Sequence, residues 1–237
     1  MYSGYTNCCV LSTFGLTDKQ VKNTVAALNL QNVNVDFTEN FLVGKLVIFS
    51  EVTSIDFQTE VDKVVNLFKE YIYCDYPTSL EEMVITVFTE NGWKLGIAES
   101  LTGGMICSKL ASISGCSNVL YEGFITYDNR AKVRRLHVPA QIIDTYGAVS
   151  EQTCKAMAKG VLANKELDFS ISTTGCAGPT SDEQDTPIGK NFIGIGDKSN
   201  IKIFENTFEG DRNFIRECVS NCALFLLLKN CQEKNIF

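Results

Sequence analysis

Two kinds of hydrophobic periodicity run along the chain, and they divide it into two parts. In the first part, apolar residues recur at helical spacing behind Thr17, which suits a helix N-cap. Alternating apolar residues follow and predict short strands. The predicted elements are a helix over 17–30, strands over 33–37 and 44–52, and a helix over 55–70. We therefore predict a small α+β domain over residues 1–76.

The second part, residues 77–237, alternates strand patterns with helix patterns. It opens with Thr78 or Ser79 ahead of Glu81 and Glu82, which is typical of a helix N-terminus. The elements predicted after that first helix are a strand over 94–98, a helix over 103–111, a strand over 119–127, a helix over 129–136, helices opened by Pro139 and Ser150, a strand over 168–174, a hairpin over 188–208 and a helix over 210–229. This order predicts an α/β fold, with a mainly parallel sheet, helices on both faces and an added hairpin.

Charge and composition restrict the classes of function. The chain has 237 residues and a net charge of −7, and the first 76 residues carry 5 basic and 9 acidic side chains. Both parts are acidic, which argues against nucleic-acid binding. No run approaches 18 apolar residues and the N-terminus lacks a signal-peptide pattern, so we expect no membrane association and a cytoplasmic protein. The ten cysteines lack zinc-ligand spacing, and we expect them to be reduced and buried, with no metal site.

The loop after the strand over 94–98 is the first candidate for chemistry. Glu99, Ser100 and Thr102 precede Gly103 and Gly104, which open a helix. Ligands of open α/β sheets bind outside the carboxyl ends of strands, and a helix N-terminus offers backbone N–H groups to a phosphate or an oxyanion. The alternative is a serine cap followed by turn glycines, and the pattern by itself favours neither.

Lys132 is the second candidate, one strand-helix-strand crossover after Ser100. If the two strands are parallel, both residues lie at the same edge of the sheet, where they can form a Ser-Lys pair. The lysine must then be neutral, through burial or through nearby positive charge from residues 130, 134 and 135. Alternatively, Lys132 belongs to a solvated helix face. A histidine-based triad would have to use His137, which is the only histidine.

Three further segments are rich in turn residues and polar groups. Residues 147–151 open a helix, and a capping role explains them as well as a role in a site. Residues 173–179 follow a strand and should reach the same sheet edge. Residues 210–212 open the last helix, where Arg212 suits an anion.

Taken together, these segments resemble the family of the C-terminal domain of CinA, which is also found alone as the nicotinamide-nucleotide amidase. The matching segments, in order, are AESLTGG (98–104), GFITYDNRAK (123–132), GAVSE (147–151), GCAGP (175–179), TPIG (186–189) and GDR (210–212). The resemblance covers roughly residues 78–230. The preceding domain resembles the small α+β middle domain of CinA, and its pattern is reminiscent of KH domains. We expect no counterpart here of the large N-terminal domain of full-length CinA.

The resemblance implies hydrolysis of the carboxamide of nicotinamide mononucleotide to nicotinate mononucleotide and ammonia. By position it makes Ser100 the nucleophile and Lys132 its base, with Tyr127 orienting groups or relaying protons. The substrate contacts it implies are Glu99, Thr102, Gly103, Gly104, Thr174, Gly175, Ala177, Gly178 and Arg212, the last for the phosphate. Backbone N–H groups of residues 102–104 would hold the oxyanion, and neither a cofactor nor a metal is needed. The expected partners are a small-molecule nucleotide and further copies of the chain.

The chain departs from the family pattern at three places. Leu101 replaces a cysteine, Asp128 replaces a serine, and Thr186 stands where a lysine is common, at the end of an acidic loop. Asp128 adds negative charge near Lys132, which opposes loss of the lysine proton. These departures keep two alternatives open: a catalytically inactive or regulatory protein that binds pyridine nucleotides, and an amidase for another carboxamide. A third alternative, a nucleic-acid module, rests instead on the KH-like pattern of the first domain.

Overall fold

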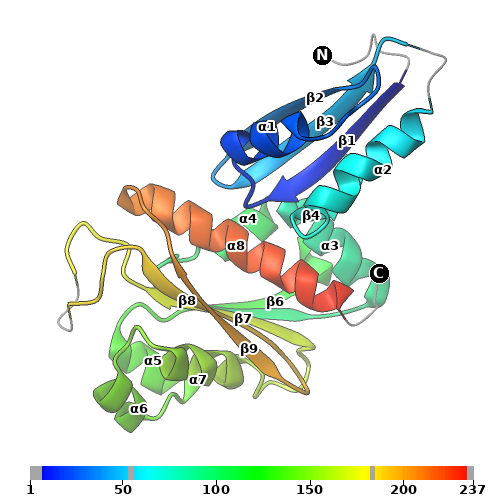
Figure 1. The fold of residues 1–237 in the computed structure, drawn as a ribbon. Coiled ribbons are helices and arrows are strands. Elements are labelled where there is room, and N and C mark those ends of the chain that lie inside the picture. The colour runs from blue at the N-terminus through cyan, green and yellow to red at the C-terminus, as the bar shows by residue number, and fades with distance from the viewer. Residues whose placement is uncertain (1–6, 53–55, 182–184, 234–237) are drawn as a thin grey trace. The chain divides into compact units, whose positions relative to one another are not determined.

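A computed structural model describes residues 7–52, 56–181 and 185–233 of the chain. The chain divides into two compact units, residues 1–80 and 81–237, and each is built on its own sheet. Figure 1 shows the two sheets and the helices that cover them. The boundary that we predict from the sequence, at residue 76, lies just before this division.

The first unit has the element order β-α-β-β-α-β. Its elements are β1 (Asn7–Phe14), α1 (Asp18–Ala26), β2 (Asn34–Asn40), β3 (Val43–Ser50), α2 (Phe57–Phe68) and β4 (Ile72–Cys74). The strands form one antiparallel sheet in the order β2-β3-β1-β4. This is the arrangement of ferredoxin-like folds, so it corrects the comparison with KH domains.

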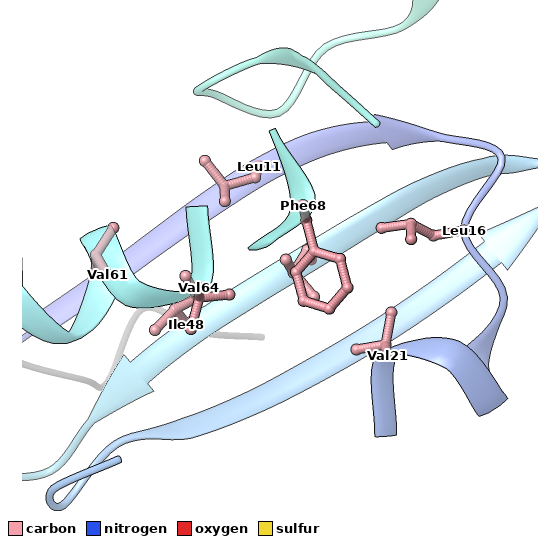
Figure 2. Packing of buried hydrophobic residues seen from close by; sticks show 8 residues of the cluster. Leu11, Leu16, Val21, Ile48, Val61, Val64 and Phe68 are labelled. Carbon is pink, nitrogen blue, oxygen red and sulfur yellow. The ribbon is translucent and has the colours of Figure 1, made fainter. Parts of the chain in front are cut away.

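The helices of the first unit cover one face of its sheet with apolar side chains. Figure 2 shows Leu11 and Ile48 from the strands packed against Val64 and Phe68 from α2. Thr17 caps α1 in a capping box with Gln20, as the sequence predicts for the cap. Helix α1 ends at Ala26, earlier than predicted.

Two strands of the first unit, β1 and β4, are absent from our sequence prediction. Strand β1 has no clear alternation, because its last four residues are all buried, apolar and polar alike. Strand β4 has only 3 residues, too few for a period of two to be recognised. The predicted start of α2 at residue 55 lies outside the described residues.

The second unit follows the predicted alternation closely. Its elements are α3 (Leu80–Asn91), β5 (Leu95–Glu99), α4 (Met105–Ala111), a short 3₁₀ helix (Cys116–Asn118), β6 (Leu120–Ile125), α5 (Asn129–Leu136), α6 (Ala140–Tyr146), α7 (Glu151–Val161), β7 (Phe169–Gly175), β8 (Lys190–Asp197), β9 (Ile201–Thr207) and α8 (Arg212–Gln232). The sheet order is β6-β5-β7-β8-β9. Strands β6, β5 and β7 are parallel, and β8 and β9 form the antiparallel hairpin.

Helices cover both faces of this sheet. Helix α7 packs on β5, β7, β8 and β9, and α5 and α6 pack against α7. Helices α4 and α8 cover the opposite face (Figure 1). The α/β class, the parallel strands and the added hairpin are therefore confirmed. None of the helices within the described ranges is long and apolar enough to cross a bilayer.

The register of the three parallel strands fixes where a site can form. Glu99 at the end of β5 pairs with Ile125 on β6 and with Thr173 on β7. Strands β5 and β7 are buried on both faces, as is usual for the centre of a parallel sheet. Their carboxyl ends, and the loops that follow them, therefore meet at one edge. The ten cysteines lie in the described ranges, and none forms a disulfide.

Candidate active site

A cavity of about 550 Å³ opens at the carboxyl edge of the parallel strands, a size typical of small-ligand sites. It is lined by the loops after β5, β6 and β7 and by residues of α5, α6 and α8. The predicted site residues that it brings together are Ser100, Tyr127, Lys132, Thr174, Gly175, Ala177, Gly178 and Arg212. The predicted residues that do not line it are Glu99, Thr102, Gly103 and Gly104.

Lys132 is buried in the wall of this cavity, with 1% of its surface exposed. Its Nζ donates to the backbone carbonyls of Thr126 (3.0 Å) and Tyr127 (3.1 Å) and, at 3.5 Å, to Asn129 Oδ1. Burial lowers the pKa of Lys132 from 10.5 to about 8, against the opposing charge of Asp128. The lysine can therefore lose its proton close to neutral pH.

Asp128 acts mainly on its own helix. Its carboxylate accepts the backbone N–H of Arg130 as the N-cap of α5, and it pairs with the Arg130 guanidinium at 2.8 Å. These bonds hold the pKa of Asp128 down at about 2. Its charge raises the pKa of Lys132, as the sequence predicts, but burial outweighs it. Burial, rather than the neighbouring arginines, is what lowers the pKa of the lysine.

Ser100 follows β5 directly and lies on the same cavity as Lys132. Its backbone N–H donates to the Thr173 carbonyl of β7 at 3.0 Å, and its own carbonyl accepts the N–H of Gly103 at 3.1 Å. The side chain is 8% exposed. No hydrogen bond joins the side chains of Ser100 and Lys132 in this structure, so they share a cavity without being paired.

The backbone donors near Ser100 differ from those that we predict. The N–H of Gly103 is taken by the Ser100 carbonyl, and that of Gly104 by the Glu99 carboxylate at 2.8 Å. Leu101 lines the cavity, and none of the described residues accepts a hydrogen bond from its N–H. Thr102, the third predicted donor, does not line the cavity, so the donor on the cavity is at Leu101, directly after the serine.

Glu99 and Thr102 point away from the cavity. Glu99 is fully buried, and its carboxylate accepts the N–H groups of Gly104, Ile106 and Cys107 at the start of α4. Thr102 is also fully buried, with its hydroxyl 2.8 Å from that of Thr173. Both were predicted to contact substrate, and the structure gives them contacts within the protein instead.

Arg212 and Tyr127 form the rim of the cavity. Arg212 is the first residue of α8, and its guanidinium donates to the Gly178 carbonyl at 2.6 Å and to the Tyr127 hydroxyl. Tyr127 is 56% exposed. Among the described residues, no carboxylate forms an ion pair with Arg212, so its charge is available to an anion.

The cavity also has lining residues that the sequence prediction did not include. Asp144 contributes an exposed carboxylate from α6, and Cys176 contributes a buried thiol. Ala148 and Val149 bring the 147–151 segment to the cavity, whereas Ser150 in the same segment caps α7. No chemical signature singles out Asp144 in the sequence; its place in α6, three residues before Gly147, brings it to the cavity.

The histidine that a triad would need lies away from this cavity. His137 is the C-cap of α5 in the left-handed conformation (φ 53°) and lies outside the cavity lining. Within the described ranges, no group of three or more His, Cys, Asp or Glu side chains is arranged to hold a metal ion.

Comparison with known proteins identifies the family. The family model of the CinA C-terminal domain matches residues 77–231. CinA-like proteins of Fusobacterium nucleatum and Syntrophus aciditrophicus are 33% and 36% identical to this chain, over 94% and 90% of its length. The chain spans 55% and 53% of those two relatives, and only 39% and 41% of two others.

Solved structures show the same likeness for the second unit. The competence/damage inducible protein CihA from Agrobacterium tumefaciens superposes with a TM-score of 0.61 at 35% identity, over 65% of this chain and 96% of that one. A CinA superfamily protein from Klebsiella pneumoniae gives a TM-score of 0.63 at 27% identity, over 65% and 96%. From the family model, its relatives and the shared fold, this chain belongs to the CinA C-terminal domain family.

Proposed function

We propose that this chain hydrolyses the carboxamide of nicotinamide mononucleotide by a Ser-Lys mechanism. One observation carries the proposal: Lys132 is buried on the cavity that Ser100 also lines, with a pKa lowered to about 8. A serine nucleophile needs a base that is neutral near working pH, and burial supplies one here. Family membership and the resemblance to the nicotinamide-nucleotide amidase support the choice of substrate.

The hydrogen bonds of Lys132 fit a base. A neutral amine has two N–H donors and one lone pair. The carbonyls of Thr126 and Tyr127 accept both hydrogens at 3.0 and 3.1 Å. The lone pair then stays available for the hydroxyl proton of Ser100.

In the proposed reaction, Lys132 takes the proton of Ser100 as Oγ attacks the carboxamide carbon. The carbonyl oxygen becomes an oxyanion, which accepts the Leu101 N–H. Lys132 then protonates the leaving nitrogen, the C–N bond breaks, and ammonia departs from an ester on Ser100. Water attacks that ester and gives a proton to Lys132; nicotinate mononucleotide leaves, and Ser100 regains its proton.

The charges around the cavity suit a nucleotide. Arg212 on the rim has no carboxylate partner among the described residues and can bind the phosphate. Its bonds to Gly178 and Tyr127 hold the guanidinium in place before substrate arrives. Tyr127 would orient Arg212, which is the first of the two roles, orienting groups or relaying protons, considered from the sequence.

A second candidate is a regulatory protein that binds pyridine nucleotides without turnover. The absence of a hydrogen bond between Ser100 and Lys132 favours it, because Lys132 in its protonated form is satisfied by three oxygens instead. The two candidates differ in turnover and share the binding site.

Ammonia release from nicotinamide mononucleotide tests the proposal. Wild type should release ammonia, while Ser100→Ala and Lys132→Ala should lose at least about a thousandfold in kcat. Calorimetric titration with the mononucleotide runs in parallel. Binding without ammonia release by the wild type would establish the regulatory candidate, and full activity of Ser100→Ala would refute the nucleophile.

A further inference from the structure

The turn that carries Ser100 is held from one side by a fully buried carboxylate. Glu99 precedes Ser100, and its Oε2 accepts the N–H of Gly104 (2.8 Å) and of Ile106 (3.2 Å), while Oε1 accepts that of Cys107 (2.9 Å). The residue before the serine is thereby tied to the helix after it. Three charge-assisted bonds to backbone N–H groups are an extensive constraint on a turn of this length.

A guanidinium holds the same turn from α8. Arg216 donates from Nη2 to the Thr102 carbonyl at 2.8 Å, and its Nη1 donates to Asn213 at 3.2 Å. Arg216 lies one helical turn after Arg212, the residue on the rim of the cavity. The first two turns of α8 therefore reach both the rim and the turn behind the serine.

These contacts determine where the Leu101 N–H points. The peptide between Ser100 and Leu101 is planar and trans, so its C=O and N–H point in opposite directions. The Ser100 C=O is fixed toward the Gly103 N–H at 3.1 Å. Any movement of residues 102–104 would break that bond and rotate the Leu101 N–H.

We propose that Glu99 and Arg216 are positioning residues for the Ser100 nucleophile and its oxyanion donor. The inference rests on the proposed function for its substrate, but its geometry concerns only the serine turn. Neither side chain lines the cavity, so neither contacts substrate. Their loss should therefore reduce kcat and leave KM nearly unchanged, because ground-state binding uses other residues.

The experiment compares Arg216→Met, Arg216→Lys and Glu99→Gln with wild type by two measurements. The first is kcat and KM for ammonia release from nicotinamide mononucleotide. The second is the rate at which a fluorophosphonate labels Ser100, read by mass spectrometry, which requires no nicotinamide substrate. Arg134→Met, an exposed arginine on α5, is the matched control.

Arg216→Met should lower both kcat and the labelling rate about tenfold or more, with KM within about twofold of wild type. Arg216→Lys keeps one donor and should recover part of both rates, and Arg134→Met should match wild type. Glu99→Gln sets an NH₂ group against backbone N–H groups and should lose more than Arg216→Met. Circular dichroism and Tm verify that each variant is folded. If Glu99→Gln does not fold, the Arg216 variants alone decide the test.

Wild-type labelling rates in both Arg216→Met and folded Glu99→Gln would overturn the inference. If wild type labels at Ser100 yet releases no ammonia from the mononucleotide, the proposed substrate fails, while the labelling rates of the variants still decide the positioning role. If Ser100 does not label in wild type, the nucleophile and its positioning fail together.

Discussion

Replacing Lys132 with methionine should stabilise the protein at pH 7 while abolishing catalysis. The pKa of Lys132 falls from 10.5 to about 8 on folding. At about 1.4 kcal/mol per pKa unit, the protonated lysine costs the fold about 3 kcal/mol. Methionine removes that cost but leaves the carbonyls of Thr126 and Tyr127 without their donor, which costs about 1–2 kcal/mol. The net gain should be about 1–2 kcal/mol.

The sign of the pH dependence identifies the cause. Below pH 8, Lys132 is protonated in both the folded and the unfolded state, and the whole cost is present. From about pH 8 to 10.5 the folded state gives up the proton first, so wild-type stability rises relative to the variant. Above 10.5 the lysine is neutral in both states and the cost is gone.

Urea unfolding at pH 7 and at pH 10 measures this difference. Trp93 is the only tryptophan, and it packs against Phe88 and Phe169 with ring centroids at 5.5 and 5.0 Å, so its fluorescence follows the unit that contains Lys132. Other groups titrate alike in both proteins and cancel in the comparison. An advantage of the variant that is equal at both pH values, or a less stable variant at pH 7, would refute the argument from burial.

Three further predictions concern the cavity and its support. Asp128→Asn keeps a helix cap but removes the charge that raises the pKa of Lys132. The rise of kcat/KM with pH should therefore move to lower pH, and activity at pH 7 should increase roughly two- to threefold. An unchanged pH profile would contradict this prediction. Asp144→Ala removes the cavity carboxylate, which can accept hydrogen bonds from the ribose hydroxyls. It should raise KM for the mononucleotide roughly tenfold, with kcat nearly constant in steady-state assays. Gly160→Ala would place Cβ 2.1 Å from the Leu136 carbonyl oxygen, and urea unfolding should show a loss of roughly 2–3 kcal/mol.

The sequence predicted the second unit well because its strands and helices have different periods and clear caps. Helix α5 lies at the predicted residues, and Ser150 caps α7 as expected. The first unit was harder: β1 has buried residues on both faces, and β4 is very short. Without these two strands, the βαββαβ order could not be recognised from the sequence.

The chemistry of the site was predictable only to the level of segments. Parallel strands bring Ser100 and Lys132 to one edge, and the crossover between them could be recognised from the sequence. A sequence does not reveal which acceptor takes each backbone N–H group. The N–H groups of residues 102–104 are predicted as oxyanion donors because they precede a helix, yet those of Gly103 and Gly104 are used by Ser100 and Glu99. No sequence motif singles out Arg216, because its contact with the turn after Ser100 depends on the packing of α8.

The same physical effect that makes Lys132 useful also makes the fold less stable. A lysine on a solvated helix face would keep its pKa near 10.5, and only about one molecule in three thousand would hold a neutral amine at pH 7. At a pKa of about 8, about one molecule in eleven does, a gain of about 300-fold in active base. A side chain that only supported the helix would incur no such cost in stability. Burial of Lys132 on the same cavity as Ser100 is what the proposed catalytic role requires, and the comparison of Lys132→Met with wild type at two pH values measures its cost in stability.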